Sequence, residues 1–169
     1  LMKMRWQPSL QIIPHYESEP LYIQAIVNSI NYKLGNINWE PDLILASYHG
    51  IPKKYFDKGD PYHCYCHKTT RLISEKYSKT KIITTFQSRF GPQEWLQPYT
   101  DKTLESLPKE GKKNILVICP GFSSDCVETL EEISIQGKES FMKSGGENFE
   151  MIPCLNDSDD HIALIKHLV

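Results

Sequence analysis

A histidine and a glutamate, far apart in the sequence, are the side chains best suited to bind a divalent metal or to move protons. His49 directly follows the apolar run 43–47, and Gly50 and Pro52 then turn the chain sharply. A neutral imidazole at such a turn could accept a proton or bind a metal at physiological pH. The sequence leaves a simpler role open, in which His49 only hydrogen-bonds its own turn.

Carboxylates are concentrated in the segment that follows residue 123. A helix is predicted to open there, and its period places Asp125, Glu128 and Glu132 on neighbouring positions of one face. Asp125 and Glu128 also fit a capping box, and the helix dipole favours acidic residues in a first turn. Capping by Asp125 and chemistry by Glu128 are compatible. If His49 and Glu128 lie across one cleft, their nitrogen and oxygen ligands suit a divalent first-row metal such as ferrous iron.

Aromatic residues in the same part of the sequence could form the walls of a pocket for a flat apolar ligand. They are Phe90, Trp95, Tyr99 and Phe122. Each of them could equally fill the hydrophobic core, and the sequence does not separate the two roles.

The run 63–67, with the sequence His-Cys-Tyr-Cys-His, holds four further potential metal ligands at the predicted start of a helix. Its histidines are spaced i and i+4, on one helical face. Its C-x-C spacing differs from that of the common structural zinc sites, so a dedicated zinc or iron-sulfur site is the weaker interpretation. Cys119 and Cys154 are predicted to be small core residues.

Hydrophobic periodicity predicts the elements that must position these side chains. Short apolar runs alternate with amphipathic segments, as expected for βαβ units around a mostly parallel sheet. The predicted strands are 10–13, 43–47, 81–86, 114–118 and 149–152. The predicted helices are 19–33, 61–77, 101–107, 125–142 and 157–168. Because open α/β folds bind ligands at the carboxyl ends of their strands, we expect the loops 48–52, 87–92 and 119–125 to form the site.

The composition is that of a globular protein with no strong charge bias. The 169 residues are 40% hydrophobic, with a formal net charge of −2, which argues against nucleic acid as a partner.

Five cysteines without a framework spacing favour a reducing compartment, and the cytoplasm is the default. No apolar run is long enough to span a membrane, although a peripheral membrane contact remains compatible with the sequence. The start at Leu1 suggests a cut chain. Motifs for dinucleotides, phosphate loops, serine esterases and zinc proteases are absent.

Five short stretches occur in a characteristic order along the chain. They are Arg5-Trp6 with Ile12-Ile13-Pro14, Ser47-Tyr48-His49-Gly50-Ile51-Pro52, Gly59-Asp60-Pro61-Tyr62, Phe86-Gln87-Ser88-Arg89-Phe90-Gly91-Pro92 with Trp95-Leu96, and Pro120-Gly121-Phe122 with Asp125-Cys126-Val127-Glu128-Thr129-Leu130. Together they resemble the ferrochelatases over almost the whole chain. That family inserts ferrous iron into protoporphyrin IX to form protohaem, the terminal step of haem biosynthesis.

The resemblance implies roles for particular residues. His49 and Glu128 match the iron-binding and catalytic pair of the family, and Asp125 is expected to assist them. The residues expected to contact the substrate are Gln87, Trp95, Phe122 and Glu132. Some members have a histidine at the position of Cys126, whereas a cysteine there is similar to the bacterial type, which puts a third proton carrier at that place in question.

The resemblance also implies an architecture larger than this chain. Family members are about twice as long, with two Rossmann-like lobes that enclose the porphyrin, and residues 1–169 match the C-terminal lobe. We therefore expect a three-layer α/β lobe that is weak or inactive without the other half. An iron-sulfur cluster would have to be internal, and no organic cofactor is expected. A chelatase for cobalt or nickel, or a non-catalytic haem- or metal-binding module, are the competing interpretations.

Overall fold

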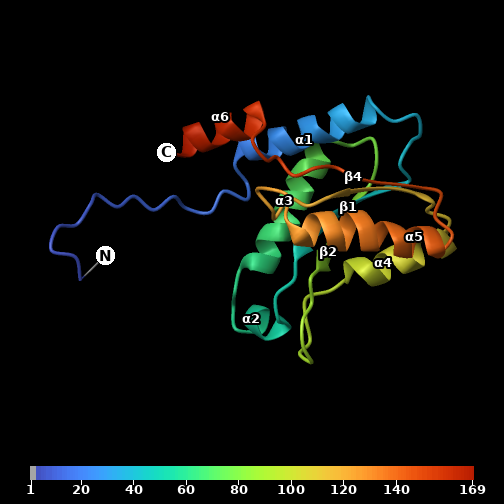
Figure 1. Ribbon diagram of the computed structural model, residues 1–169, viewed down its shortest axis with the longest axis horizontal. Coiled ribbons are helices and arrows are strands. Elements are labelled where there is room, and N and C mark those ends of the chain that lie inside the picture. The colour runs from blue at the N-terminus through green and yellow to red at the C-terminus, as the bar shows by residue number, and fades with distance from the viewer. Residues whose placement is uncertain (1–2) are drawn as a thin grey trace.

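Four parallel strands form the centre of the computed structural model, which describes residues 3–169 (Figure 1). The strands are β1 (Leu43–His49), β2 (Ile82–Gln87), β3 (Asn114–Ile118) and β4 (Asn148–Met151), in the spatial order β2-β1-β3-β4. The strands are short and nearly continuous in buried residues, as expected for a parallel sheet that is covered on both faces.

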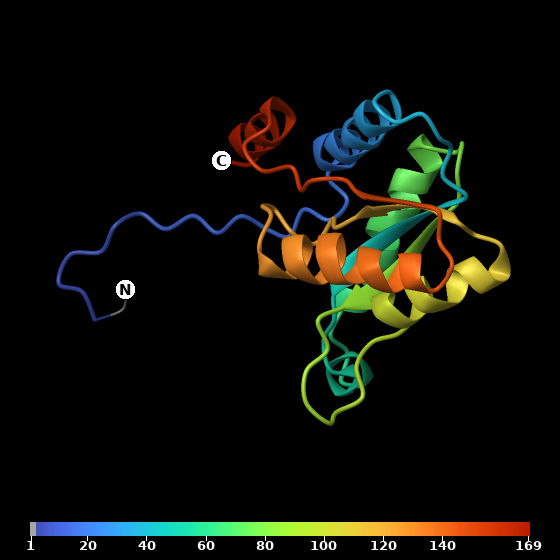
Figure 2. The same ribbon diagram turned by 45° about the vertical axis from the view of Figure 1, so that its right-hand side comes forward.

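Helices cover the sheet in two layers (Figures 1 and 2). The first layer holds α1 (Pro20–Leu34), α3 (Tyr62–Lys76) and α6 (Asp159–Leu168). The second holds α4 (Thr100–Ser106), the 3₁₀ turn η1 (Leu107–Glu110), the π-helix η2 (Glu128–Gly137) and α5 (Lys138–Lys143). The short helix α2 (Lys53–Asp57) extends from the body together with the loop that follows β2. None of the helices within residues 3–169 has the length and apolar character needed to cross a bilayer.

Alternation along the strands decides which side chains face which layer. In β1, Ile44, Ala46 and Tyr48 join the core under α1 and α3. Leu43 and Leu45 join the other core, under α4 and η2. His49 continues the second series, so its side chain is directed toward the layer that contains η2.

The predicted fold class is confirmed, and most of the predicted elements are too. The strands predicted at 43–47, 81–86, 114–118 and 149–152 correspond to β1 to β4, with ends that differ by two residues at most. The helices predicted at 19–33, 61–77, 101–107 and 157–168 correspond to α1, α3, α4 and α6. Their apolar faces produce the periodicity that predicted them.

Two predictions about elements were wrong. The segment 10–13 is not a strand: it belongs to an extended arm that leaves the body of the molecule, and its Ile12 side chain is 81% exposed. Its apolar residues have no neighbouring strand to pair with. The helix predicted at 125–142 begins only at Glu128, and its first ten residues form the π-helix η2 before α5 continues it.

The chain leaves the neighbouring strands β1 and β3 toward opposite faces of the sheet. After β1 the chain enters the layer of α3, whereas after β3 it enters the layer of η2. Because β1 and β3 are neighbours, the loops that follow them separate toward opposite faces at the carboxyl edge, and we call the space between these two loops the crevice. Such a switch point is where open α/β sheets bind their ligands.

Candidate active site

His49 is the last residue of β1, at the switch point. Its Nδ1 atom lies 2.6 Å from the carbonyl oxygen of Gly50. A carbonyl oxygen only accepts hydrogen bonds, so Nδ1 carries the proton and Nε2 keeps its lone pair. The simpler role predicted for His49, a bond to its own turn, is therefore present. It also fixes the tautomer that leaves Nε2 able to accept a proton or to bind a metal.

The turn after His49 depends on a close approach of backbone to backbone. The amide of Gly50 donates to the carbonyl of Gln87 at 2.8 Å. A β-carbon on Gly50 would lie 2.9 Å from that carbonyl oxygen and 3.2 Å from the Trp95 ring, so only glycine fits. On the other side, the Tyr62 hydroxyl donates to the carbonyl of His49 at 2.9 Å. The buried Trp95 ring lies against Gly50 and so supports the turn.

Glu128 is the first residue of η2, and its side chain is partly exposed. The Cys126 thiol and the backbone of Glu128 itself hold the pKa of this carboxyl below its ordinary value, against the effect of burial. The nearby imidazole of His49 adds a smaller effect in the same direction. Glu128 therefore stays ionised at neutral pH and lies close enough to His49 to interact with it electrostatically. π-Helical segments are rare and are found frequently at functional sites.

Gln87 connects the two sides of the site through its side-chain amide. Residues His49 and Gln87 are paired across β1 and β2, at the ends of both strands. The amide nitrogen of Gln87 donates to the main-chain carbonyl of Glu128 at 2.6 Å, and its oxygen accepts from the Ser47 hydroxyl at 2.7 Å. Gln87 is only 4% exposed, and its amide holds the start of η2 in place.

Glu132 makes the second contact between η2 and the end of β2. Both of its carboxylate oxygens accept hydrogen bonds from Ser88, one from the amide at 2.6 Å and one from the hydroxyl. Ser88 has a φ of 61°, in the left-handed region that L residues rarely adopt. The Glu132 carboxylate therefore stabilises an unusual backbone conformation next to Gln87.

Asp125 is directed away from the crevice. Its carboxylate accepts from the Asn156 amide at 2.8 Å, the Thr129 hydroxyl at 3.0 Å and the Cys154 main-chain amide at 3.2 Å. Partial burial opposes ionisation, but these hydrogen bonds outweigh it and hold the pKa of Asp125 below its ordinary value. The capping box predicted with Glu128 does not form. Asp125 instead joins the loop before η2 to the segment after β4.

The aromatic residues predicted near the site have different surroundings. The Phe122 ring lies 6.3 Å from the His49 ring, on the loop after β3, so it borders the crevice. Tyr99 lies under the Arg89 guanidinium at 4.2 Å, and Phe90 is 82% exposed. Of these aromatic residues, Phe122 therefore lies next to the His49 imidazole, whereas Trp95 lies against the turn at Gly50.

An open hollow of about 370 Å³ follows the first turns of η2. It is lined by Glu128, Glu131 and Glu132, together with Ser88 and Arg89. His49 is not among its lining residues. Within residues 3–169 no group of three or more acidic, histidine or cysteine side chains is arranged to hold one metal ion. The two predicted metal ligands, His49 and Glu128, are not part of a larger cluster of these side-chain types within the described residues.

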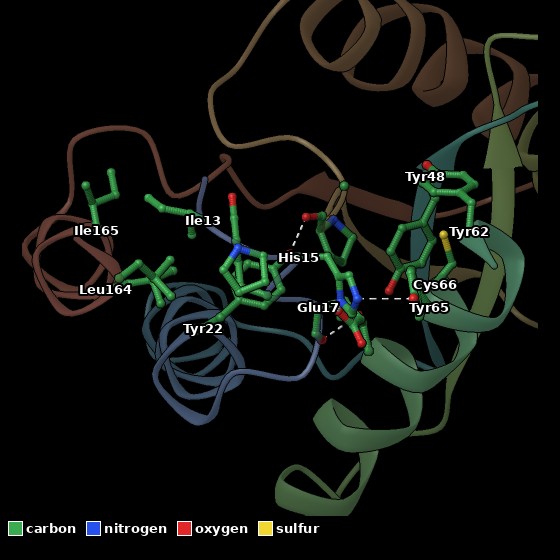
Figure 3. A pocket seen from close by; sticks show the side chains of 16 residues that line it. Ile13, His15, Glu17, Tyr22, Tyr48, Tyr62, Tyr65, Cys66, Leu164 and Ile165 are labelled. Atoms are coloured by element: carbon green, nitrogen blue, oxygen red, sulfur yellow. Dashed lines mark hydrogen bonds and ion pairs between the residues drawn. The ribbon is translucent and has the colours of Figure 1, made fainter. Parts of the chain in front are cut away.

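A larger cavity of about 490 Å³ lies behind the loop after β3, between the arm, α3 and α6 (Figure 3). Tyrosines supply much of its lining, with apolar side chains from the arm and from α6, and Figure 3 labels Tyr22, Tyr48, Tyr62, Ile13 and Leu164. It contains none of the predicted catalytic residues. Its link to the site is Tyr62, whose hydroxyl reaches the His49 carbonyl.

A chain of hydroxyl groups below the site was not predicted from the sequence. The Ser47 hydroxyl lies 2.8 Å from that of Thr100, which donates to Thr85 at 2.9 Å. All three residues are buried. The feature of the sequence that could have predicted this network is the presence of Ser47 and Thr85 within the strands, two residues before His49 and Gln87. Polar residues in that position indicate a buried network that must be satisfied.

Comparison with known proteins agrees with the resemblance seen in the sequence. The family model described as Ferrochelatase matches residues 1–169. A ferrochelatase of Rhizobium meliloti is 59% identical over all of this chain and 50% of its own length. Ferrochelatases of Allorhizobium ampelinum and Agrobacterium fabrum are 58% and 52% identical over the same shares. The chain thus spans about half the length of the curated relatives it matches.

Proposed function

Because the chain belongs to the ferrochelatase family, we propose that it contributes the iron-binding side of an enzyme that inserts ferrous iron into protoporphyrin IX to form protohaem. The observation that supports the proposal is that His49 ends β1 and Glu128 begins η2 on the two sides of the switch point, and His49 is among the groups that lower the pKa of the Glu128 carboxyl. Both side chains are partly exposed, so a substrate can reach them.

The chemistry requires two protons to leave the macrocycle as iron enters. Protoporphyrin loses its two pyrrole N–H protons, and the Fe²⁺ ion, which is a substrate here, takes the four nitrogens. In our proposal the Nε2 lone pair of His49 accepts a pyrrole proton or holds iron, and the Glu128 carboxylate binds iron from the other side. The proposal is supported by the Gly50 carbonyl bond, which keeps Nδ1 protonated and Nε2 free.

Four other predicted residues act indirectly in this proposal. Gln87 and Glu132 position the first turns of η2 through their bonds to the Glu128 carbonyl and to Ser88. Asp125 fixes the loop before η2, and Trp95 supports the turn that holds His49. Phe122, beside the imidazole, is proposed to contact the porphyrin face.

We propose that residues 1–169 form the C-terminal lobe and that a second lobe supplies the opposite wall of the porphyrin site. This is supported by the length of the relatives, about twice that of the chain, and by the open character of the hollow beside Glu128. On this proposal the 169-residue chain alone inserts iron slowly or not at all.

The test is an insertion assay in a chimera that joins this chain to the other half of the Rhizobium meliloti relative. The chimera should form protohaem from Fe²⁺ and protoporphyrin IX without oxygen. His49→Ala and Glu128→Gln should each reduce the rate by at least about 10²-fold, the size expected when a positioned acid-base group is lost, with unchanged thermal unfolding. Near-normal protohaem formation by either variant would reject the assignment.

Metal preference separates this function from its alternatives. An imidazole and a carboxylate do not select among first-row metals by affinity alone, so cobalt or nickel insertion is the nearest competitor. Rates with Fe²⁺, Co²⁺ and Ni²⁺ in the same chimera decide between them. Porphyrin binding without incorporation of any metal would instead support a haem- or metal-binding module.

We further propose a cytoplasmic enzyme that makes a peripheral contact with a membrane through α2 and the loop after β2. Its support is the exposure of Tyr55, Phe56 and Phe90 next to Lys54 and Lys58, a combination suited to an interface with anionic lipid. Co-sedimentation with vesicles that contain phosphatidylserine should fall when Phe90 is replaced by serine.

A further inference from the structure

Two histidines on α3 remain outside the site described above. His63 and His67 are one turn apart at the start of α3, and their ring centroids are 4.4 Å apart. This is the spacing at which two imidazoles on one helical face can bind the same metal ion. Both residues are partly open to solvent, so an ion can reach them.

The pair is set apart by its lack of hydrogen-bond partners. Within residues 3–169, neither ring of the pair makes a hydrogen bond or an ion pair. Each of the other four histidines does: His15 with Glu17, His49 with Gly50, His161 with Asn156, and His167 with Glu19. The nitrogens of His63 and His67 are therefore free to bind a ligand.

The surroundings of the pair favour neutral rings. The His63 ring lies 4.7 Å from Phe56 and is stacked at 5.7 Å from Phe86, while the His67 ring is 6.3 Å from Phe86. Burial lowers the pKa of both histidines, and the neighbouring His63 adds to the effect on His67. Unprotonated imidazoles are the form that binds metals, so no proton has to be displaced at neutral pH.

We propose that His63 and His67 form a two-histidine site for a borderline divalent metal such as Zn²⁺ or Cu²⁺, with water completing the coordination. Imidazole nitrogen suits these ions, and with only two protein ligands the site binds them reversibly. The site is distinct from the iron site, since it lies on α3 and uses no residue of η2. It is adjacent to it through Tyr62, which precedes His63 and bonds the His49 carbonyl at 2.9 Å.

The experiment measures Zn²⁺ alone, by calorimetric titration at pH 7.5 in a His49→Ala background that removes the iron site. We expect one saturable Zn²⁺ site, and His67→Gln should weaken it by at least tenfold. His63→Gln should have the same effect. The matched control is His15→Gln, which should keep the site because His15 is already bonded to Glu17.

Thermal unfolding shows whether a variant that loses Zn²⁺ binding is still folded. Saturating Zn²⁺ should raise the thermal unfolding temperature of the His49→Ala chain, because a ligand that binds only the folded state stabilises it. It should leave the His67→Gln variant unchanged, while without metal both should melt alike. Unaltered Zn²⁺ affinity in His67→Gln and His63→Gln, or loss of the site in His15→Gln, would overturn the proposal. So would the absence of saturable binding in the His49→Ala chain. None of these results depends on chelatase activity.

Discussion

The two sides of the crevice are held in place in different ways. The His49 side chain is oriented by the bond from its Nδ1 to the carbonyl of Gly50 and by the direction of β1, and a backbone bond from Gly50 to Gln87 holds the turn that follows. Glu128 is fixed by side chains that are about forty residues away, because Gln87 bonds its carbonyl and Ser88 bonds Glu132. One side of the site is thus held mainly by backbone contacts and the other by side chains of distant residues.

This difference predicts that the Glu128 side depends on single side chains, whereas the His49 side depends on the backbone of its turn. η2 is a π-helix, a winding that regular backbone hydrogen bonding does not favour, and it needs its contacts with the end of β2. The His49 turn can be broken only by changing the backbone itself. The substitutions below separate the two sides.

The largest effect on stability is expected for Gln87→Leu. It removes the bonds to Ser47 and to the Glu128 carbonyl and leaves buried polar groups without partners, at a cost of about 2 to 3 kcal/mol. Urea denaturation gives this value, and iron insertion in the chimera should fall with it. The imidazole NMR signals of His49 should keep their tautomer pattern. Wild-type stability and activity in this variant would remove the role assigned to Gln87.

Gly50→Ala tests the local side. Its methyl group would lie 2.9 Å from the Gln87 carbonyl oxygen and 3.2 Å from the Trp95 ring, so the turn must shift, at a cost of about 2 kcal/mol. Here the His49 tautomer pattern should change. Gly35→Ala is the matched control, because its methyl group would meet only ordinary contacts at 3.5 Å. Equal urea midpoints for the two variants would contradict the close approach.

A smaller effect is expected for Ser88→Ala. It loses the hydroxyl bond to Glu132 but keeps the amide bond, so the destabilisation should be about 1 kcal/mol. Ser88→Gly should cost less than Ser88→Ala, since glycine adopts the φ of 61° without strain. Comparison of the two urea midpoints measures this, and the reverse order would show that the backbone at Ser88 is not strained.

The smallest effect is a pH dependence at Asp125. Its pKa in the folded protein lies below the ordinary 3.8, so its hydrogen bonds stabilise the fold above that pH. This contribution to stability is lost as the pH falls below 3.8 and then through the lower pKa that Asp125 has in the folded protein. Asp125→Asn should therefore be less stable than wild type at pH 7, and the gap should narrow by pH 3. A gap that is independent of pH would mean that the Asp125 charge does not matter.

The sequence predicts well the parts of the molecule that depend on local patterns. Apolar runs of four to six residues predicted β1 to β4, and helical periodicity predicted α1, α3, α4 and α6. The place of His49 at the end of a strand followed from the same patterns. Segment 10–13 failed because an apolar pattern does not reveal whether a partner strand exists.

The parts that sequence patterns missed depend on contacts between distant residues. Gln87 is buried at the end of β2, beside His49, and its amide bonds the first carbonyl of η2, a contact that no local pattern encodes. Asp125 fits a capping box in the sequence, but Asn156 and Cys154, about thirty residues further on, take its carboxylate instead. Long-range partners thus decided which of the two acidic residues stayed free.

The central claim is that His49 and Glu128 act on one metal ion, and a double-mutant cycle for Fe²⁺ binding tests it most directly. The measurement uses anaerobic titration of the chain in a His67→Gln background, with His49→Ala, Glu128→Gln and both changes together. If one ion contacts both side chains, each single change weakens binding strongly and the double change weakens it little further. Free-energy changes that simply add, or wild-type affinity in either single variant, would contradict the account.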